Sequence, residues 1–492
     1  MPRSSATQAS RNDAMRRPHA PPCGLAAQWG VCFVARLANS YGYWLRRASR
    51  IHPHCGASAW GNNPMAGPII ARFAPRRSPM TEPSAAPSVY RHTGFVAFLA
   101  ARLVAVFATQ VQAVVVAWQV YDLTREPLAL AYVGLAQFLP MLALLLPAGD
   151  LIDRFSRKTI LAASWSVGAV CSGLLWWLAG HGVAGVSWMY AVLVLFGCSR
   201  AFSAPALSSL LPQIVPRGQL AQAVAANGMI MRAATIGGPF IGGVLYALGG
   251  GALAYAVCLA SFALGTLLLA RVAVARAAPH GPAQGSIFQR FGAGIRFIRS
   301  RPIVLGTISL DLFAVLLGGV VALLPIYAHE VLHVGPQGLG ALRSAMAIGE
   351  VGAGFYLSMR PFNRRVGRTM FAAVAVFGLA NLVFSLSTVF ALSFAALMVA
   401  GAADMVSVYI RGALVQFSTP DDMRGRVNAV NMLFIGSSNE LGEFRAGTSA
   451  AWLGVVPAAV LGSLCTLGVV GAWMAWFKPL REVDRFEDAE PR

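Results

Sequence analysis

The sequence of 492 residues has few charged side chains, since Asp, Glu, Lys and Arg together make up only 12% of it. A water-soluble globular domain usually carries about 25%. Apolar residues make up 57% instead, and the mean hydropathy is +0.61. A soluble fold could not bury this much apolar surface in its core. The composition therefore excludes a soluble enzyme, a disordered scaffold and a disulfide-linked secreted domain, and it predicts a protein that crosses a membrane several times.

Acidic residues, lysine and paired cysteines are also scarce. There are 19 acidic residues against 39 basic ones, and only Lys158 and Lys478 are lysines. Much of the basic excess lies in residues 1–79 and the rest mainly in short segments between apolar runs, which is typical of membrane loops and argues against a nucleic-acid surface. The seven cysteines show no C-x-x-C spacing, so no zinc ribbon or redox pair is predicted. A G-x-x-x-x-G-K-[ST] phosphate loop is missing as well, which argues against ATP-driven chemistry.

Residues 1–88 form a basic extension rich in Arg and Pro, with no apolar run long enough to span a bilayer. We expect this extension to be unstructured. Met80 opens a short segment that leads directly into the first apolar run, so we interpret Met80 as the true start of the protein. The alternative is a basic arm that lies on anionic lipid.

Apolar runs of about 20 residues, the length that crosses the hydrocarbon core, recur twelve times. They lie near 94–120, 129–148, 159–179, 187–211, 220–248, 251–272, 303–328, 338–358, 369–387, 389–414, 427–449 and 453–477. The loops near 149–158, 271–301, 359–368 and 417–426 are basic, whereas the intervening loops hold one basic residue, Arg125. By the positive-inside rule both termini, including the tail 479–492, lie in the cytoplasm of the inner membrane.

The linker at 274–301 divides the runs into six within residues 89–273 and six within residues 302–478. A Pro, an Ala and an Asn recur with the same spacing in the two halves, at 216–227 and 420–431. Such repeats are typical of transporters built from two related bundles. We therefore predict an all-α membrane protein with twelve transmembrane helices in two pseudo-symmetric six-helix bundles. The linker mixes apolar residues and Arg at helical spacing over 287–299, which predicts a short interfacial helix.

The first basic loop reads Gly-Asp-Leu-Ile-Asp-Arg-Phe-Ser-Arg-Lys over residues 149–158. Gly149 permits a tight turn, Asp153 can cap the next helix, and Arg154, Arg157 and Lys158 hold the loop at the membrane surface. This run resembles the Gly-x-Leu-x-Asp-Arg-x-x-Arg-Lys signature of the major facilitator superfamily. The resemblance implies that the loop gates the change between access states.

Other segments extend the resemblance. In the second half the loop at 360–368 keeps only a basic remnant, with Asn363 where an Asp would stand. The fifth run contains Gly238, Pro239 and Gly242, where small residues allow close helix approach and Pro kinks the helix. This motif is similar to one found in the exporter branches of the superfamily.

Longer stretches, over 310–316, 322–327, 403–411, 419–431 and 436–444, resemble the branch that contains the enterobactin exporter and related efflux proteins. The resemblance covers about residues 90–486. It implies proton-driven export of a siderophore-like molecule or a hydrophobic drug. We expect a monomer without cofactor whose partners are the cargo, protons and the lipid bilayer.

A charged side chain within an apolar run costs at least ~2.5 kcal/mol on insertion scales. Each such side chain is therefore a candidate either for a structural ion pair or for a functional role. When the two halves of the sequence are aligned so that Pro127 matches Pro336, Arg102 matches Asp311. The two charges are therefore expected at the same depth in the membrane, one in each half. We predict that both side chains face a central cavity and pair across it, and that Asp311 couples transport to protons.

Further side chains are candidates for the same roles, although a structural ion pair is the alternative for each carboxylate. The other proton-coupling candidates are Glu350, Asp404, Glu440 and Glu443, and the cargo-binding candidates are Arg102, Gln110, Gln112 and Arg411. Asp404 and Arg411 lie two turns apart, ~10 Å along a helix, so Ser407 or a neighbouring helix would have to link them. We interpret Arg200 and Arg232 as structural.

A rival hypothesis rests on His329-Glu330-Val-Leu-His333, which fits the H-E-x-x-H pattern of zinc metalloproteases. An intramembrane protease would hold the metal on two histidines one helical turn apart and use Glu330 as base. The motif falls at the end of the seventh run rather than within the bilayer, and a Leu-Asp-Gly segment for a third ligand is missing from the sequence. A pair of interfacial histidines therefore explains the motif better.

Overall fold

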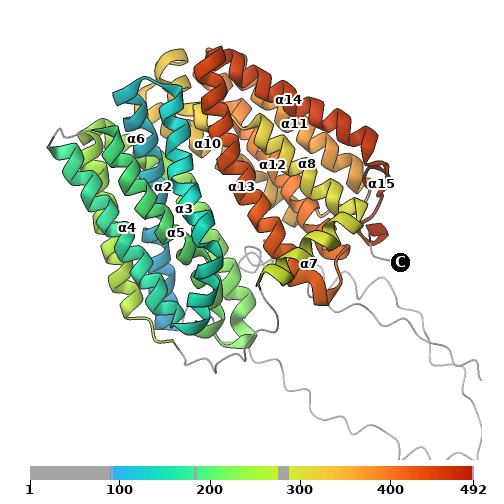
Figure 1. The fold of residues 1–492 in the computed structure, drawn as a ribbon, viewed down its shortest axis with the longest axis horizontal. Helices are drawn as coiled ribbons and strands as arrows, with labels where there is room; N and C mark the ends of the chain where they lie inside the picture. Colours follow the sequence, from blue (N-terminus) through green and yellow to red (C-terminus); the bar gives the residue numbers. More distant parts are fainter. Residues whose placement is uncertain (1–88, 90–91, 182–184, 275–286, 490–492) are drawn as a thin grey trace, which may run out of the picture.

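The computed structural model of the chain describes residue 89 and residues 92–181, 185–274 and 287–489. Helices of the described residues form two bundles that stand side by side (Figure 1). The predicted extension of residues 1–88, with Met80, lies outside the described residues.

The first bundle begins with four helices and ends with one very long one. Its helices are α2 (Thr93–Thr124), α3 (Pro127–Arg154), α4 (Arg157–Gly180), α5 (Val186–Ile214) and α6 (Leu220–Ala270). The backbone of α6 leaves the helical region at Gly249 and Gly250, and Gly250 has φ 64° and ψ −164°, a conformation that only glycine adopts readily. α6 therefore folds back as two arms, which confirms the predicted turn near residue 250.

The second bundle has six main helices, with a linker helix before it and a short tail helix after it. The linker helix is α7 (Ile287–Ser300), and the tail helix is α15 (Lys478–Glu482). The six main helices are α8 (Pro302–Gly318), α10 (Gly335–Met359), α11 (Val366–Leu386), α12 (Phe390–Phe417), α13 (Asp421–Leu453) and α14 (Val455–Trp476). Between α8 and α10 lie a 3-10 turn at Val321–Leu323, the short α9 (Leu324–Ile326) and a π turn at Tyr327–Val331.

The span predicted over 303–328 is present at Pro302–Val331, but it is not one regular α-helix, because α8 ends at Gly318. A side chain at Gly318 would collide with the hydroxyl of Thr466 on α14, so glycine allows α8 and α14 to touch there. The next residue, Gly319, adopts an extended ψ of 125° and stops the helix.

The first basic loop is shorter than predicted. α3 continues to Arg154, so that only Phe155 and Ser156 separate it from α4. The N-cap of α4 is Ser156, whose side chain accepts from the Thr159 backbone N–H at 3.1 Å, and not the predicted Asp153, which belongs to α3.

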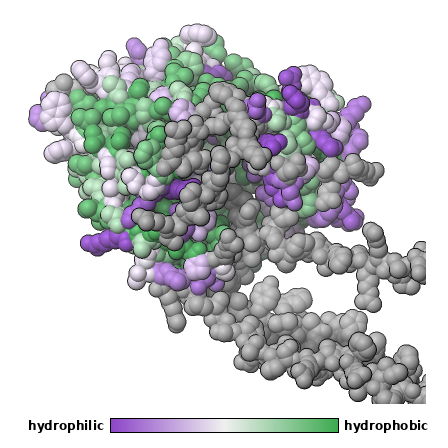
Figure 2. Space-filling view, turned by 60° about the horizontal axis from the view of Figure 1, so that its bottom comes forward, coloured by the Kyte–Doolittle hydropathy of each residue, from purple (hydrophilic) through white to green (hydrophobic). Residues whose placement is uncertain are grey.

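Nine helices in the described residues are long and apolar enough to cross a membrane. One of them, at Gln222–Ala270, is the folded α6, and the more polar α10 and α13 complete the twelve predicted spans. Figure 2 shows hydrophobic side chains over much of one flank of the molecule, with hydrophilic ones gathered mostly towards the edges of the view. The chain is thus an all-α membrane protein with twelve spans, as predicted.

The two ends of the bundles differ. One end, here the linker end, carries α7, the α3–α4 connection and the loop at 360–365; the other, here the far end, carries the α2–α3 connection at Arg125–Glu126 and the turn of α6. The helix predicted at 287–299 is present as α7, but its apolar face packs against protein, where Ile298 contacts a cluster with Val304 of α8 and Val427 of α13.

The tail folds back on the second bundle at the linker end. Asn363 donates to Glu487 at 3.0 Å and accepts from the Phe486 backbone N–H at 3.0 Å. The backbone N–H of Arg365 donates to Asp484, also at 3.0 Å. Tail carboxylates thus face the loop that has Asn where the first half has Asp153.

Each bundle has its own apolar core, and a third cluster joins them at the far end. It packs Trp118 and Tyr121 of α2 against Leu323, Tyr327 and Leu339 of the second bundle. α3 and α13 lie close together near the top of Figure 1 and diverge towards the bottom, where α7 lies. The bundles are therefore packed tightly at the far end.

Candidate functional site

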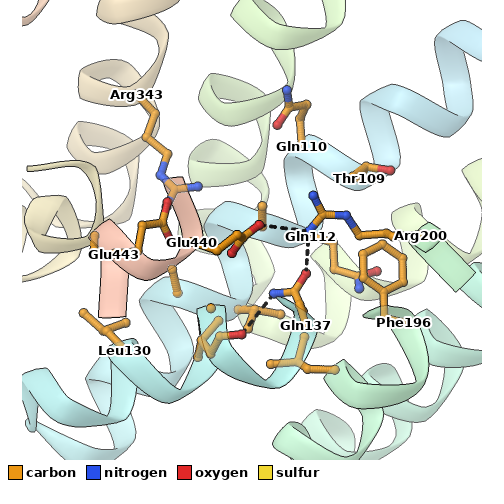
Figure 3. A pocket seen from close by; sticks show the side chains of 17 residues that line it. Thr109, Gln110, Gln112, Leu130, Gln137, Phe196, Arg200, Arg343, Glu440 and Glu443 are labelled. Atoms are coloured by element: carbon orange, nitrogen blue, oxygen red, sulfur yellow. Dashed lines mark hydrogen bonds and ion pairs between the residues drawn. The ribbon is translucent and has the colours of Figure 1, made fainter. Parts of the chain in front are cut away.

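A cavity of about 210 Å³ lies between the two bundles (Figure 3). Its walls come from α2, α3 and α5 of the first bundle and from α10, α13 and the 3-10 turn of the second. The polar side chains that line it are Thr109, Gln110, Gln112, Gln137, Arg200, Arg343, Glu440 and Glu443. Apolar side chains such as Val116, Leu130, Val133, Leu193 and Phe196 fill the spaces between them.

The wall from the first bundle offers hydrogen-bond donors. Arg200 of α5 donates to the Gln137 side-chain oxygen at 3.3 Å. Gln112 is only 2% exposed, and its oxygen accepts from the Ser172 hydroxyl at 2.8 Å. The amide nitrogen of Gln112 has no partner within the part of the chain that the structure describes. A buried donor left unpaired costs free energy, so this nitrogen favours a ligand or water with an acceptor.

The wall from the second bundle carries two carboxylates. Glu440 and Glu443 lie one helical turn apart on α13 and therefore share a face. A Cβ at Gly134 of α3 would lie 3.6 Å from a Glu440 oxygen and 3.7 Å from a Glu443 oxygen. Glycine at this position thus leaves room for both carboxylates, and Figure 3 shows Arg343 of α10 directed towards Glu443.

One ion pair crosses the cavity. Nη1 of Arg200 lies 3.7 Å from Oε1 of Glu440, which links α5 of one bundle to α13 of the other. Two cations, Arg200 and Arg343, and two carboxylates line the cavity, so its formal charge is zero. At 3.7 Å the pair is loose, so a proton on Glu440 or a polar cargo can replace one partner.

Asp311 and Arg411 form an ion pair inside the second bundle, between α8 and α12. Both are more than nine-tenths buried, and Asp404 and Ser407 line a small void with Asp311. α8 is thus the neighbouring helix that offers Arg411 its partner, and these side chains do not line the cavity described above.

The predicted pairing of Arg102 with Asp311 across a cavity is wrong. Arg102 donates to Asn227 of α6 within the first bundle, and Asp311 pairs with Arg411. Each charge finds a partner in its own bundle because an unpaired charge away from water is costly. Arg102 also lies outside the lining of the cavity.

The two arginines interpreted as structural both pair with a carboxylate of the other bundle. Arg200, interpreted as structural, lines the cavity and pairs with Glu440. Arg232 makes an ion pair across the bundles, with Glu350 of α10 at 2.6 Å. Arg343 was missed, although it is an ionisable residue within the eighth apolar run and the rule that singled out Asp311 applies to it equally.

The helix-five motif holds α6 against α2 and α10. A side chain at Gly238 would collide with Cβ of Gln110, and one at Gly242 would lie 3.2 Å from the Val111 backbone of α2. The Pro239 carbonyl faces Gly340 of α10 across the bundle boundary. The motif thus serves close helix packing, and Gln110 is held at the cavity, where it also donates to Thr235 at 3.3 Å.

The signature residues all lie at the linker end. Gly149, Asp153 and Arg154 belong to the last turns of α3, and Arg157 and Lys158 begin α4. Lys158 donates to the carbonyl oxygens of residues 270 and 272 at 2.8 and 2.7 Å, next to the end of α6. A cation at a helix C-terminus is favourable, so Lys158 ties the start of α4 to the end of α6.

The H-E-x-x-H segment does not have the geometry of a zinc site. His329 and Glu330 lie in the π turn, whereas His333 lies beyond it with φ 51°. The His329 ring accepts from Arg125, and Glu330 accepts from Tyr121. Within the described residues no group of three His, Cys, Asp or Glu side chains is placed to hold a metal ion.

The sequence matches the family described as transmembrane secretion effector over residues 84–492. It is 26% identical over 408 residues to the enterobactin exporter EntS of Citrobacter koseri, which covers 81% of this chain and 95% of that protein. It is 28% identical over 410 residues to the multidrug efflux pump Tap of Mycobacterium tuberculosis, with 80% and 95% covered.

A solved structure of a bacterial homologue of the iron transporter ferroportin, in an inward-facing state, shares the fold. The TM-score is 0.61 at 18% identity, over 80% of this chain and 100% of that one. The twelve spans in two bundles, the cavity between them and the sequence match agree. This chain belongs to the transmembrane secretion effector family of the major facilitator superfamily, whose members are membrane transporters rather than enzymes.

Proposed function

We propose that this protein exports a small molecule across the inner membrane, coupled to protons, by alternating access between its two bundles. The observation that carries the proposal is the cavity at the bundle boundary, with the Arg200–Glu440 ion pair across it. The names of the enterobactin exporter and of the multidrug efflux pump support the direction of transport.

The access states follow from the packing of the bundles. The basic loops assign the linker end to the cytoplasm, and the apolar cluster closes the far end. A volume of about 210 Å³ is below the 300–1,000 Å³ or so of pockets that enclose drug-sized ligands, so cargo must enter while the bundles are further apart. This conformation therefore belongs to the cytoplasm-facing side of the cycle.

Protons act on the carboxylates that hold the bundles together. A proton on Glu440 cancels its charge and its attraction for Arg200, which weakens a contact between the bundles and shifts the balance of access states. Glu443 shares this cavity, and Glu350 pairs with Arg232 across the same boundary. Protonation of Asp311, beside Asp404, would instead change the packing of α8 on α12 within one bundle.

The lining also limits the cargo. Because its charges balance, the cavity favours a molecule without net charge, and the free amide nitrogen of Gln112 favours one with hydrogen-bond acceptors. Hydrophobic drugs without net charge fit this description, and so do siderophore-like molecules in their protonated, uncharged form. An anionic cargo would depend on Arg200 and Arg343. The cargo-binding candidates Arg102 and Arg411 do not line the cavity.

The test measures accumulation of enterobactin and of the neutral dye Nile red in cells, before and after collapse of the proton gradient. Wild type should lower accumulation only while the gradient is intact, and Glu440→Gln should lose most of this effect. Glu482→Gln, which changes an exposed carboxylate of the tail, is the matched control and should behave as wild type.

The variant Asp311→Asn distinguishes between the two candidate proton-coupling sites, Asp311 and Glu440. Loss of gradient-dependent efflux in this variant alone would place coupling at Asp311 and not at Glu440. If wild type lowers the accumulation of neither enterobactin nor Nile red, the proposal of export is wrong. If wild type lowers the accumulation of either molecule after the gradient has collapsed, the proposal of proton coupling is wrong. Loss of enterobactin efflux alone in Arg200→Gln and Arg343→Gln would identify an anionic cargo.

A further inference from the structure

The π turn at Tyr327–Val331 makes polar contacts with the first bundle that the proposed transport site does not use. We propose that His329 and Glu330 form a gate that keeps the far end closed, with Tyr121 of α2 and Arg125, the residue that follows α2, as its counterpart. This inference rests on the proposed alternating access, and it assigns a role to the H-E-x-x-H segment.

The first contact joins Glu330 to Tyr121. The Tyr121 hydroxyl donates to a Glu330 carboxylate oxygen, while the Tyr121 ring is 1% exposed within the apolar cluster that joins the bundles. A hydrogen bond to a charged acceptor is about twice as strong as one between neutral groups. Separation of the bundles at the far end would therefore break a strong contact at the edge of an apolar seal.

The second contact joins His329 to Arg125. The Arg125 guanidinium donates to the His329 ring and to the Asp122 carboxylate, the latter at 2.7 Å. Arg125 ends α2 in a left-handed conformation with φ 56°, which turns the chain at this point. The His329 ring also packs on Trp118 at 5.6 Å and on Tyr121 at 5.8 Å between ring centroids. His329 is thus held by a guanidinium and two aromatic rings of the other bundle.

The π turn explains why two adjacent residues reach α2 together. Its wider backbone bond, from the Leu332 N–H to the Tyr327 carbonyl at 2.8 Å, adds one residue to the turn. The buried Tyr327 anchors this turn to α11, because its hydroxyl donates to the Ser385 carbonyl at 2.9 Å and its ring packs on Phe384 at 4.7 Å. The gate residues therefore move with the second bundle.

The gate lies between the cavity and the far surface. Its contacts are at the end of α2, at Tyr121 and Arg125, whereas the part of the same helix that lines the cavity ends at Ala117, about one turn deeper. Cargo that leaves the cavity at the far end has to pass these contacts, so they must break in each transport cycle.

The experiment measures distances between spin labels on the full-length chain, in a background whose seven cysteines are replaced by alanine. One label pair is placed at the far end, at the exposed Trp188 of α5 and Leu386 of α11. A second pair is placed at the linker end, at the exposed Phe155 and Met359. These distances need neither cargo nor a proton gradient.

The variant Tyr121→Phe with His329→Phe keeps the rings but removes both polar contacts. We expect the population with a longer far-end distance to rise at least about tenfold over the parent, since the loss of even one charge-assisted hydrogen bond implies a shift of that size. The control Tyr255→Phe removes a bond of 2.7 Å to Gln119 inside the first bundle, and it should leave the distances unchanged. Glu330→Gln, which keeps the shape of the side chain, should give a smaller shift in the same direction.

Unchanged far-end distances in both the double variant and Glu330→Gln would overturn the gate. A far end that opens while the linker-end distance stays constant would support the gate but contradict the rocking motion of the proposed function. A parent chain that already shows the longer far-end distance would also overturn the gate, since the contacts would then not hold the bundles together.

Discussion

Charged side chains inside the membrane spans find their partners in two ways. Asp311 and Arg411 pair within one bundle, as does Arg102 with its amide partner on α6. Pairs of this kind can persist while the bundles move. In the proposed transport cycle, the ion pairs between the bundles, such as Arg200 with Glu440, would instead have to break and reform. At the scale of the residue, a charge whose partner lies in the same bundle is therefore a candidate for stabilising the fold. A charge whose partner lies in the other bundle is a candidate for a role in transport.

We expect Arg411→Leu to lower the free energy of unfolding by about 3 kcal/mol, because it leaves Asp311 buried without its partner. Arg411→Leu combined with Asp311→Leu should be more stable than Arg411→Leu alone, since no unpaired charge remains. Unfolding in detergent micelles measures both variants. This account would be contradicted if the double variant lost as much free energy of unfolding as Arg411→Leu and Asp311→Leu lose together as single variants.

Helix pairs at the bundle boundary depend on glycine. A Cβ at Gly340 of α10 would collide with the Pro239 carbonyl of α6, and one at Gly243 with the Pro336 carbonyl. One turn further along α10, the Ser344 hydroxyl donates to the Ile236 carbonyl of α6 at 2.7 Å. The two backbones can come this close only because small residues lie at the contact. At the scale of the element, α6 and α10 form a seam that sets how the bundles meet.

Gly340→Ala should weaken this seam, because the added methyl group meets a backbone atom that cannot move away easily. We expect a loss of stability of about 1–3 kcal/mol, the usual cost of overpacking, together with a longer far-end distance between spin labels. Gly352→Ala on the same helix is the matched control. A Cβ at Gly352 meets nothing within 4 Å, so this change should be neutral or slightly stabilising. Equal effects of the two substitutions would show that the seam is not tight.

The whole molecule combines one closed end with one end of basic loops. The apolar cluster that joins the bundles lies at the far end, and the signature residues on α3 and α4 lie at the linker end. The two ends therefore differ in packing and in charge, and by the positive-inside rule we expect the basic linker end to face the cytoplasm.

Reporter fusions test this topology. Alkaline phosphatase fused after Gly180, at the far end of α4, should be active because it folds outside the cytoplasm. The same enzyme fused after Arg360, at the linker end, should be inactive, and a fluorescent protein at the C-terminus should fluoresce. High phosphatase activity after Arg360 would reverse the orientation and, with it, the assignment of the cytoplasm-facing state.

The number of spans and the family were predictable from the sequence because both depend on local patterns. A span needs about 20 apolar residues whatever its neighbours are, and the loops carry their charge in sequence order. The signature at 149–158 and the turn at Gly250 are equally local. Even so, the ends of elements differed, since α3 ran through the predicted loop and α8 stopped at Gly318.

The partners of the polar residues were decided only by the tertiary structure. The spans here are apolar on nearly all sides, so a sequence shows which residues share a face but not which neighbour that face meets. Asp311 thus pairs with Arg411 instead of Arg102, and Arg200 and Arg343 reach the cavity. The sequence determined that this chain crosses the membrane twelve times. The rotation of each helix in its bundle, set by side-chain packing between distant segments, decided which of its charges can meet a cargo.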